Sequence, residues 1–149
     1  MTKVLTIDGK EVGFRASALV PRLYRHKMGR DIVRDLNTLR KSFDKALKAT
    51  NAVAPVEPPE DADDETVAQY LLDLEAYEEA TQDAQLSVLD LEIFENVAYI
   101  MARHYDPKLP STPEEWLEGF DVFSIYEILP EILALWNLQE KTTSVPKNG

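Results

Sequence analysis

The apolar residues of segment 31–48 recur at steps of three and four positions, the spacing that one face of an α-helix produces. These residues are Ile32, Leu36, Leu39, Phe43 and Leu47. Basic residues fall on the opposite side of the same predicted helix: Arg30, Arg34, Lys41, Lys45 and Lys48. The sequence therefore predicts a helix that buries one stripe and exposes a basic one. The basic stripe is either an ordinary solvated face or a docking surface for an acidic partner.

Charge is divided unequally along the chain. Residues 1–50 contain 12 of the 16 basic and 5 of the 27 acidic residues, a net charge of +7, and residues 51–149 contain the other 4 and 22, a net charge of −18. Two surfaces of opposite charge favour contact with a partner or with further copies of the chain. The overall net charge of −11 argues against general affinity for nucleic acid.

Length and composition predict one soluble domain in a reducing compartment. A chain of 149 residues can bury a core without covalent cross-links, and the absence of cysteine excludes disulfides. No apolar run approaches the roughly 20 residues of a transmembrane helix, and residues 1–11 lack the apolar segment of a secretory signal. We predict that residues 1–138 form the domain and that residues 139–149 form a flexible tail.

The predicted fold is mainly α (α+β), with an N-terminal β-hairpin followed by about five helices. Two short runs with strand character flank Asp8-Gly9, a pair that accepts the positive φ angles of a tight turn, so residues 3–15 are predicted to form the hairpin. Its free edge is a candidate site of self-association. A short helix within residues 17–28 is expected to end at Gly29.

The middle of the chain contains an acidic, proline-rich linker over residues 49–65. Three prolines prevent a helix there, and six acids among the nine residues 57–65 favour an extended chain. A calcium-binding loop is disfavoured because the required ligand spacing is absent.

Further helices are predicted on the C-terminal side of the linker. Residues 64–105 form either one bent helix or two helices with a break near Thr81-Gln82-Asp83. Capping-box patterns then start helices at about 113–119 and 125–137, and Pro130 is expected to kink the second.

Residue patterns for catalysis or metal binding are absent from the sequence. His26 lies in a basic cluster, and His104 falls in the last turn of a predicted helix, where a histidine usually satisfies the terminal carbonyls. The five glycines are scattered, and no serine lies in a Gly-x-Ser-x-Gly turn. We therefore predict that the protein is not an enzyme and uses no cofactor or metal.

Segment 116–136 contains an excess of large apolar side chains, including both tryptophans. On the last predicted helix these side chains cover roughly 180° of the circumference, whereas a surface helix needs about 100°. The segment therefore forms either a groove that binds another protein or a helix clasped on two sides within the core.

Two segments of the chain carry family-like motifs. The first is Tyr24-Arg25-His26-Lys27-Met28-Gly29-Arg30-Asp31-Ile32, directly after the predicted hairpin, and the second covers residues 114–120 and 123–136. In this order, and followed by a tail rich in Thr, Ser and Lys, they resemble the tail assembly chaperones of long-tailed bacteriophages and prophages of Gram-positive bacteria. Residues 49–85 carry no such motif.

The resemblance implies a non-catalytic role in the host cytoplasm. Members of this family bind the tape measure protein, a very long helical polypeptide, keep it soluble and extended, and help recruit the major tail tube protein that replaces them. They are absent from the mature virion. Many are made in two forms, the longer by a programmed −1 frameshift. Here Pro146-Lys147-Asn148 can be encoded by a slippery A-AAA-AAC heptamer, a hypothesis that the gene sequence tests.

The predicted interaction residues come from both motif segments. Carried over as a structural or self-contact motif are Tyr24, Arg25, Gly29, Arg30 and Asp31. Predicted to face the client are Trp116, Phe120, Phe123, Tyr126, Leu129, Leu133 and Trp136. The alternative function is a nucleic-acid-binding or regulatory phage protein that uses the basic helix 30–48.

Overall fold

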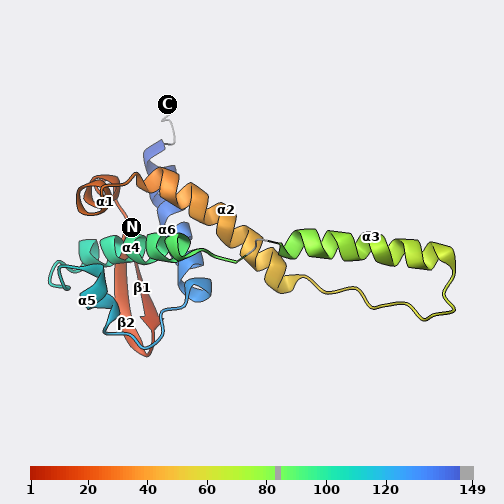
Figure 1. Cartoon of the computed structure of the whole chain (residues 1–149). Helices are drawn as coiled ribbons and strands as arrows, with labels where there is room; N and C mark the ends of the chain where they lie inside the picture. The colour runs from red at the N-terminus through yellow and green to blue at the C-terminus, as the bar shows by residue number, and fades with distance from the viewer. Residues whose placement is uncertain (83–84, 145–149) are drawn as a thin grey trace. The chain divides into compact units, whose positions relative to one another are not determined.

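The computed structural model describes residues 1–82 and 85–144, with side chains described as far as Leu138 (Figure 1). In chain order the elements are β1 (Thr2–Ile7), β2 (Lys10–Arg15), α1 (Val20–Met28), α2 (Ile32–Asn51), α3 (Asp64–Thr81), α4 (Val88–Tyr105), α5 (Pro113–Leu117) and α6 (Ile125–Ser144). The predicted α+β class with an N-terminal hairpin is confirmed, with six helices in the described ranges.

The chain divides into two compact units. The first unit comprises residues 1–36 together with the chain from residue 88 onward, and the second unit comprises residues 37–87. The hairpin, α1, α4, α5 and α6 therefore belong to the first unit. The second unit holds most of α2, the acidic linker and α3.

The hairpin has the predicted two-residue turn. Asp8 and Gly9 have φ angles of 53° and 75°, and Ile7 pairs with Lys10 on either side of them. A turn with two positive φ angles matches the twist of the two strands, which is why Asp-Gly is suited to it. The register places Leu5 opposite Val12, on the side of the hairpin that buries its apolar residues.

Helix α4 forms the centre of the first unit. It contacts β2, α1, α5 and α6, and Figure 1 shows it between α1 and the hairpin. Its buried residues are Asp90, Ile93, Phe94, Val97, Ala98, Tyr99, Ile100, Met101 and Ala102. The helix starts at Val88, so Leu86 precedes it and is only half-buried, and Leu89 in its first turn is exposed.

Helix α2 has the predicted two faces. Its buried apolar residues are Ile32, Leu36, Leu39, Phe43 and Ala46. Its exposed basic residues are Arg34, Lys41, Lys45 and Lys48. The helix continues to Asn51 and α3 starts at Asp64, so the extended linker is shorter than predicted.

Residues 64–105 form two helices, the second of the two alternatives that the sequence left open, and the break follows Thr81. Helix α3 ends at Thr81 and α4 begins at Val88. The carboxylate of Asp63 accepts a hydrogen bond from the Thr66 N–H at 2.8 Å and so caps the start of α3.

The C-terminal helix is longer than predicted. Helix α6 continues through Pro130 as far as Ser144, past the predicted end near residue 137. Gln139, Glu140 and Lys141 favour helix, which explains the extension. Residues 145–149, with the proposed frameshift site, lie outside the described residues.

Replacement of Trp136 tests the core assignment of α6. Trp136 is 4% exposed, so we expect Trp136→Ala to lower the free energy of unfolding by about 3–5 kcal/mol. Leu91→Ala on α4 is the control, because Leu91 is 38% exposed and its loss should cost less than about 1 kcal/mol. Denaturant titration measures both changes. Equal stability losses would contradict the burial of Trp136.

Candidate functional site

The first motif builds the corner between α1 and α2. The Tyr24 hydroxyl donates a hydrogen bond to Asp35 Oδ2 at 2.8 Å. The Arg30 guanidinium donates to both carboxylate oxygens, from Nε to Oδ2 at 2.8 Å and from Nη2 to Oδ1 at 2.9 Å. Tyr24 and Asp35 are buried. A bidentate pair of this kind fixes geometry as well as adding stability, so the motif holds the two helices together.

Asp35 is the residue of this corner that the sequence analysis missed. It lies three positions after Ile32, on the apolar side of α2, and a carboxylate there signals a buried partner. Burial alone would raise the pKa of Asp35, but hydrogen bonds from Arg30 and Tyr24, together with the charges of Arg30 and Arg34, hold that pKa below its usual value. Burial, and then the Asp35 carboxylate, raise the pKa of the Tyr24 hydroxyl. The group is therefore a fixed link at neutral pH.

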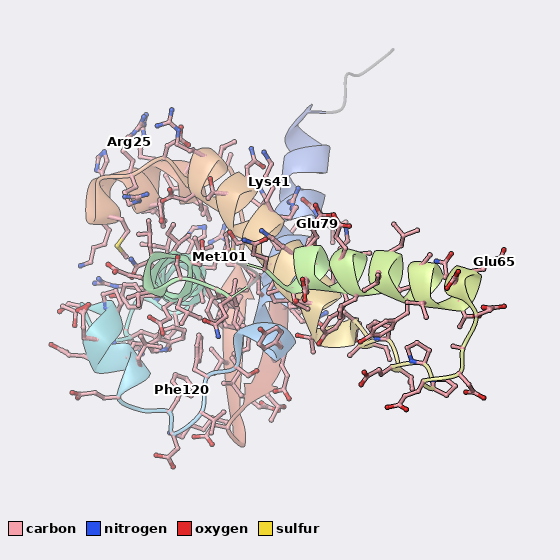
Figure 2. All side chains as sticks on the ribbon, turned by 45° about the vertical axis from the view of Figure 1, so that its right-hand side comes forward. Arg25, Lys41, Glu65, Glu79, Met101 and Phe120 are labelled. Atoms are coloured by element: carbon pink, nitrogen blue, oxygen red, sulfur yellow. The ribbon has the colours of Figure 1, made fainter. Side chains whose placement is uncertain are left out.

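The other motif residues end one helix and start the next. Gly29 has a φ of 69°, and its N–H donates to the Arg25 carbonyl at 2.8 Å, which terminates α1. Asp31 Oδ1 accepts hydrogen bonds from the N–H groups of Val33 and Arg34 at 2.9 and 3.4 Å, which caps α2. Arg25 is exposed and points outward from α1 (Figure 2). The structural role predicted for the motif accounts for these contacts.

Three of the seven residues predicted to face a client are instead part of the core. Trp116 is 5% exposed, Leu129 is fully buried, and Trp136 is buried. The buried residues of α6 are Ile125, Ile128, Leu129, Ile132, Leu135 and Trp136, an arc of about 120° at 100° per residue. Helix α6 is therefore a core helix that packs against α4, which fits the second of the two alternatives that the sequence left open.

The remaining predicted client residues lie at the margin of this core. Phe120, Phe123 and Leu133 are partly exposed, and Tyr126 is 47% exposed. The Phe120 and Phe123 rings lie 5.4 and 5.2 Å from the Trp116 ring. Aromatic contacts at such distances favour a tightly packed cluster. The segment thus contributes its tryptophan to the core and leaves parts of its phenylalanines at the surface.

An open pocket, here called the aromatic hollow, lies between β2, the end of α4 and α5. It has a volume of about 400 Å³, and its apolar wall consists of Val12, Tyr105, Leu109, Pro110, Trp116 and Phe120. Lys10 lies over the Phe120 ring at 5.4 Å and donates a hydrogen bond to the Gly119 carbonyl. The rim also carries Glu11 and Glu115, so groups of both charges surround an apolar floor.

Gly13 allows Tyr105 to form the wall of the aromatic hollow. A Cβ atom at position 13 would lie 2.2 Å from Tyr105 Cε1, well inside contact distance. The absent side chain is therefore what lets the Tyr105 ring lie against β2. Any larger residue at position 13 would displace this ring and change the hollow.

A second pocket of about 320 Å³ borders the loop that joins α5 to α6. Its apolar residues are Leu5, Ile7, Val122 and Ile128. Residues 118–124 join α5 to α6, and this loop contributes Phe120 to the aromatic hollow and Val122 to the second pocket. Phe120 is labelled on this loop in Figure 2. Asp8 holds the loop to the hairpin by accepting a hydrogen bond from the Asp121 N–H at 2.8 Å.

His104 lies at the end of α4 beside the N-terminal part of the first unit. Its Nε2 atom is 2.8 Å from the Ser17 hydroxyl oxygen. Burial lowers the pKa of His104, and the positive charges of Arg15 and the chain N-terminus lower it further. The neutral ring is therefore favoured in the folded protein.

Helix α3 differs from the other long helices because none of its residues is buried. Leu71 and Leu72 are 57% and 60% exposed, and Val67 is exposed as well.

The described residues, 1–82 and 85–144, contain no cluster of three or more His, Cys, Asp or Glu side chains arranged to hold a metal ion. Within the same ranges, no helix combines the length and apolar character needed to cross a bilayer. Comparisons with protein-family models, with curated proteins and with solved structures returned no match.

The corner between α1 and α2 can be tested by Tyr24→Phe. This change removes the hydroxyl donor to Asp35, and a hydrogen bond to a charged group contributes about 1.5–3 kcal/mol, so we expect a loss of that size in the free energy of unfolding. Tyr77→Phe on the exposed helix α3 is the matched control and should change stability by less than about 0.5 kcal/mol. A silent Tyr24→Phe change would show that Arg30 alone holds Asp35.

The pKa of His104 predicts a pH dependence of stability. Because this pKa is below the usual 6.5, the unfolded chain takes up the proton first as the pH falls. The contribution of His104 to the free energy of unfolding is therefore fully present above the usual pKa of 6.5, and it is lost as the pH falls from about 7 toward 5. Denaturant titrations at several pH values across this range give the free energy of unfolding. Its dependence on pH should be weaker for His104→Gln than for the wild-type chain. An identical pH dependence would contradict the assignment.

Proposed function

We propose that the protein is a non-catalytic chaperone of phage tail assembly that binds a helical segment of the tape measure protein. The observation that carries this proposal is the pair of pockets beside loop 118–124, the first mainly apolar and the second lined by both apolar and polar side chains. The segment that resembles the family contributes Trp116 and Phe120 to the first pocket and Ile128 to the second. A helix that docks on such a surface inserts side chains spaced by one turn. The large aromatic walls of the first pocket suit a Leu, Met or aromatic anchor.

The aromatic hollow is suited to holding a client without a chemical step. Its floor is apolar, so burial of a client side chain is favourable at roughly 25 cal/mol per Å² of apolar surface. Its rim carries Lys10, Glu11 and Glu115, which can orient the polar flanks of an amphipathic helix. These features favour binding of many similar helical segments over binding of one particular sequence. A long client requires such broad binding.

In this proposal the protein acts in the host cytoplasm, keeps the tape measure protein extended, and gives way to the major tail tube protein before the virion is complete. The apolar contact sites are small and open, which favours release when a larger surface competes for the same client. The motif that resembles the family at α1–α2 then serves to hold the first unit in shape.

Two surface variants test the client site. We expect Phe120→Ala and Val122→Glu each to weaken binding of the tape measure protein from the same phage genome about tenfold, because each alters one of the two pockets. Val53→Glu in the second unit is the matched control, because Val53 is exposed and lines neither pocket. Co-expression yield and titration with purified segments measure binding, and thermal unfolding verifies that the variants fold.

The outcome that contradicts this function is also specific. Full binding by both pocket variants would remove the two pockets as the client site. Tight binding of duplex DNA that falls steeply with salt, and that is lost in Lys41→Glu, would instead support the nucleic-acid alternative based on the exposed basic face of α2.

A further inference from the structure

Two surfaces outside the client site combine apolar residues with charges of opposite sign. The first is an open pocket between α1 and α4, here called the α1–α4 cavity, and the second is the apolar stripe of α3. We propose that the α3 stripe of one copy docks into the α1–α4 cavity of a second copy, so that the protein associates head to tail.

The α1–α4 cavity is apolar inside and basic at its rim. Its volume is about 410 Å³, and its apolar lining consists of Leu19, Leu23, Tyr99, Ile100 and Pro107. The remaining lining residues are His26, Lys27, Arg103 and His104. Pockets of about 300–1,000 Å³ bind ligands of substantial size, so this one can accept large side chains.

The rim cations retain charge for a partner. Lys27 donates a hydrogen bond to the Ser111 carbonyl, and Arg103 donates one to the Tyr99 hydroxyl at 3.3 Å, so both contact neutral groups. Neither forms an ion pair with a carboxylate in the part of the chain that the structure describes. Figure 2 shows further nitrogen atoms along the outside of α1 around Arg25. An acidic helix is therefore the occupant that this rim favours.

Helix α3 presents the matching surface. Val67, Leu71 and Leu74 lie at steps of four and three, which places them along one stripe, and the first two are exposed. Asp73 and Glu75 lie on either side of Leu74, one helical step of 100° in each direction. Figure 2 shows oxygen atoms along this helix near Glu65 and Glu79.

The charge distribution selects a second copy in a head-to-tail arrangement. Residues 49–102 contain no Lys, Arg or His, so two α3 helices facing each other would place like charges together. Helix α1 contains no acidic residue, so its surface attracts α3. A contact between two different surfaces leaves one of each free at the ends of every assembly, and it can therefore propagate.

Paired variants test this contact. We expect the full-length chain to associate with rising concentration, as measured by sedimentation velocity, and to dissociate as salt rises from about 0.05 to 0.5 M. Leu71→Glu and Leu19→Glu should each weaken association at least tenfold, because each places a carboxylate in the apolar contact. Leu72→Glu is the matched control, because Leu72 is similarly exposed but lies about 130° from the centre of the stripe.

Mixing separates this arrangement from a symmetric one. The Leu71→Glu chain keeps an intact cavity and the Leu19→Glu chain keeps an intact stripe, so an equimolar mixture should form dimers that stop at two chains. A wild-type chain that stays monomeric at about 100 μM and low salt would overturn the proposal. Association that is retained in both the Leu71→Glu and the Leu19→Glu chains would also overturn it. Because neither surface shares a residue with the pockets beside loop 118–124, failure here leaves binding of the tape measure protein unaffected.

Discussion

The burial of α4 is the constraint on which the first unit depends. Residues 97–102 are buried without interruption, so this helix is covered on nearly all sides, as is typical of a central core helix. Ala98 and Ala102 lie one turn apart and leave room for neighbouring elements to approach. A two-stranded hairpin is marginally stable alone, and here β2 gains its stability by packing on α4. Aromatic residues nearer the C-terminus also pack on α4.

The core takes up aromatic side chains from the C-terminal segment, and this determines which apolar surface is left open for binding. Trp116 packs against the Tyr99 ring of α4 at 5.8 Å, and Phe123 packs against the Phe94 ring at 5.3 Å. These contacts use most of the apolar surface that made segment 116–136 resemble a groove. What stays open lies beside the loop between α5 and α6, where the chain leaves the core. The proposed client site therefore lies where this loop meets the hairpin, and α6 contributes Ile128 to its second pocket.

Local signals predicted the elements well, and non-local packing decided the site. The Asp8-Gly9 turn, the left-handed Gly29 and the start of α5, where the Thr112 hydroxyl accepts a hydrogen bond from the Glu115 N–H, each depend on neighbouring residues, so the sequence identified them. The link between Tyr24 and Asp35 and the burial of Trp136 depend on which elements meet in space. An apolar stripe shows which face of a helix avoids water, but it does not show what covers that face. Helices α3 and α6 both carry such stripes, and only α6 is buried.

The unequal charge distribution explains why the two proposed contacts use separate surfaces. The proposed client site consists of pockets with rims of mixed charge, whereas the proposed self-association would pair an acidic helix with a basic rim. Copies joined head to tail would hold their client pockets at a high effective concentration along a long polypeptide. Weak binding at each pocket then becomes strong binding to the whole client, while release at each position stays fast. A protein that must hold a very long helix and later yield it to other subunits benefits from this combination more than from one tight site.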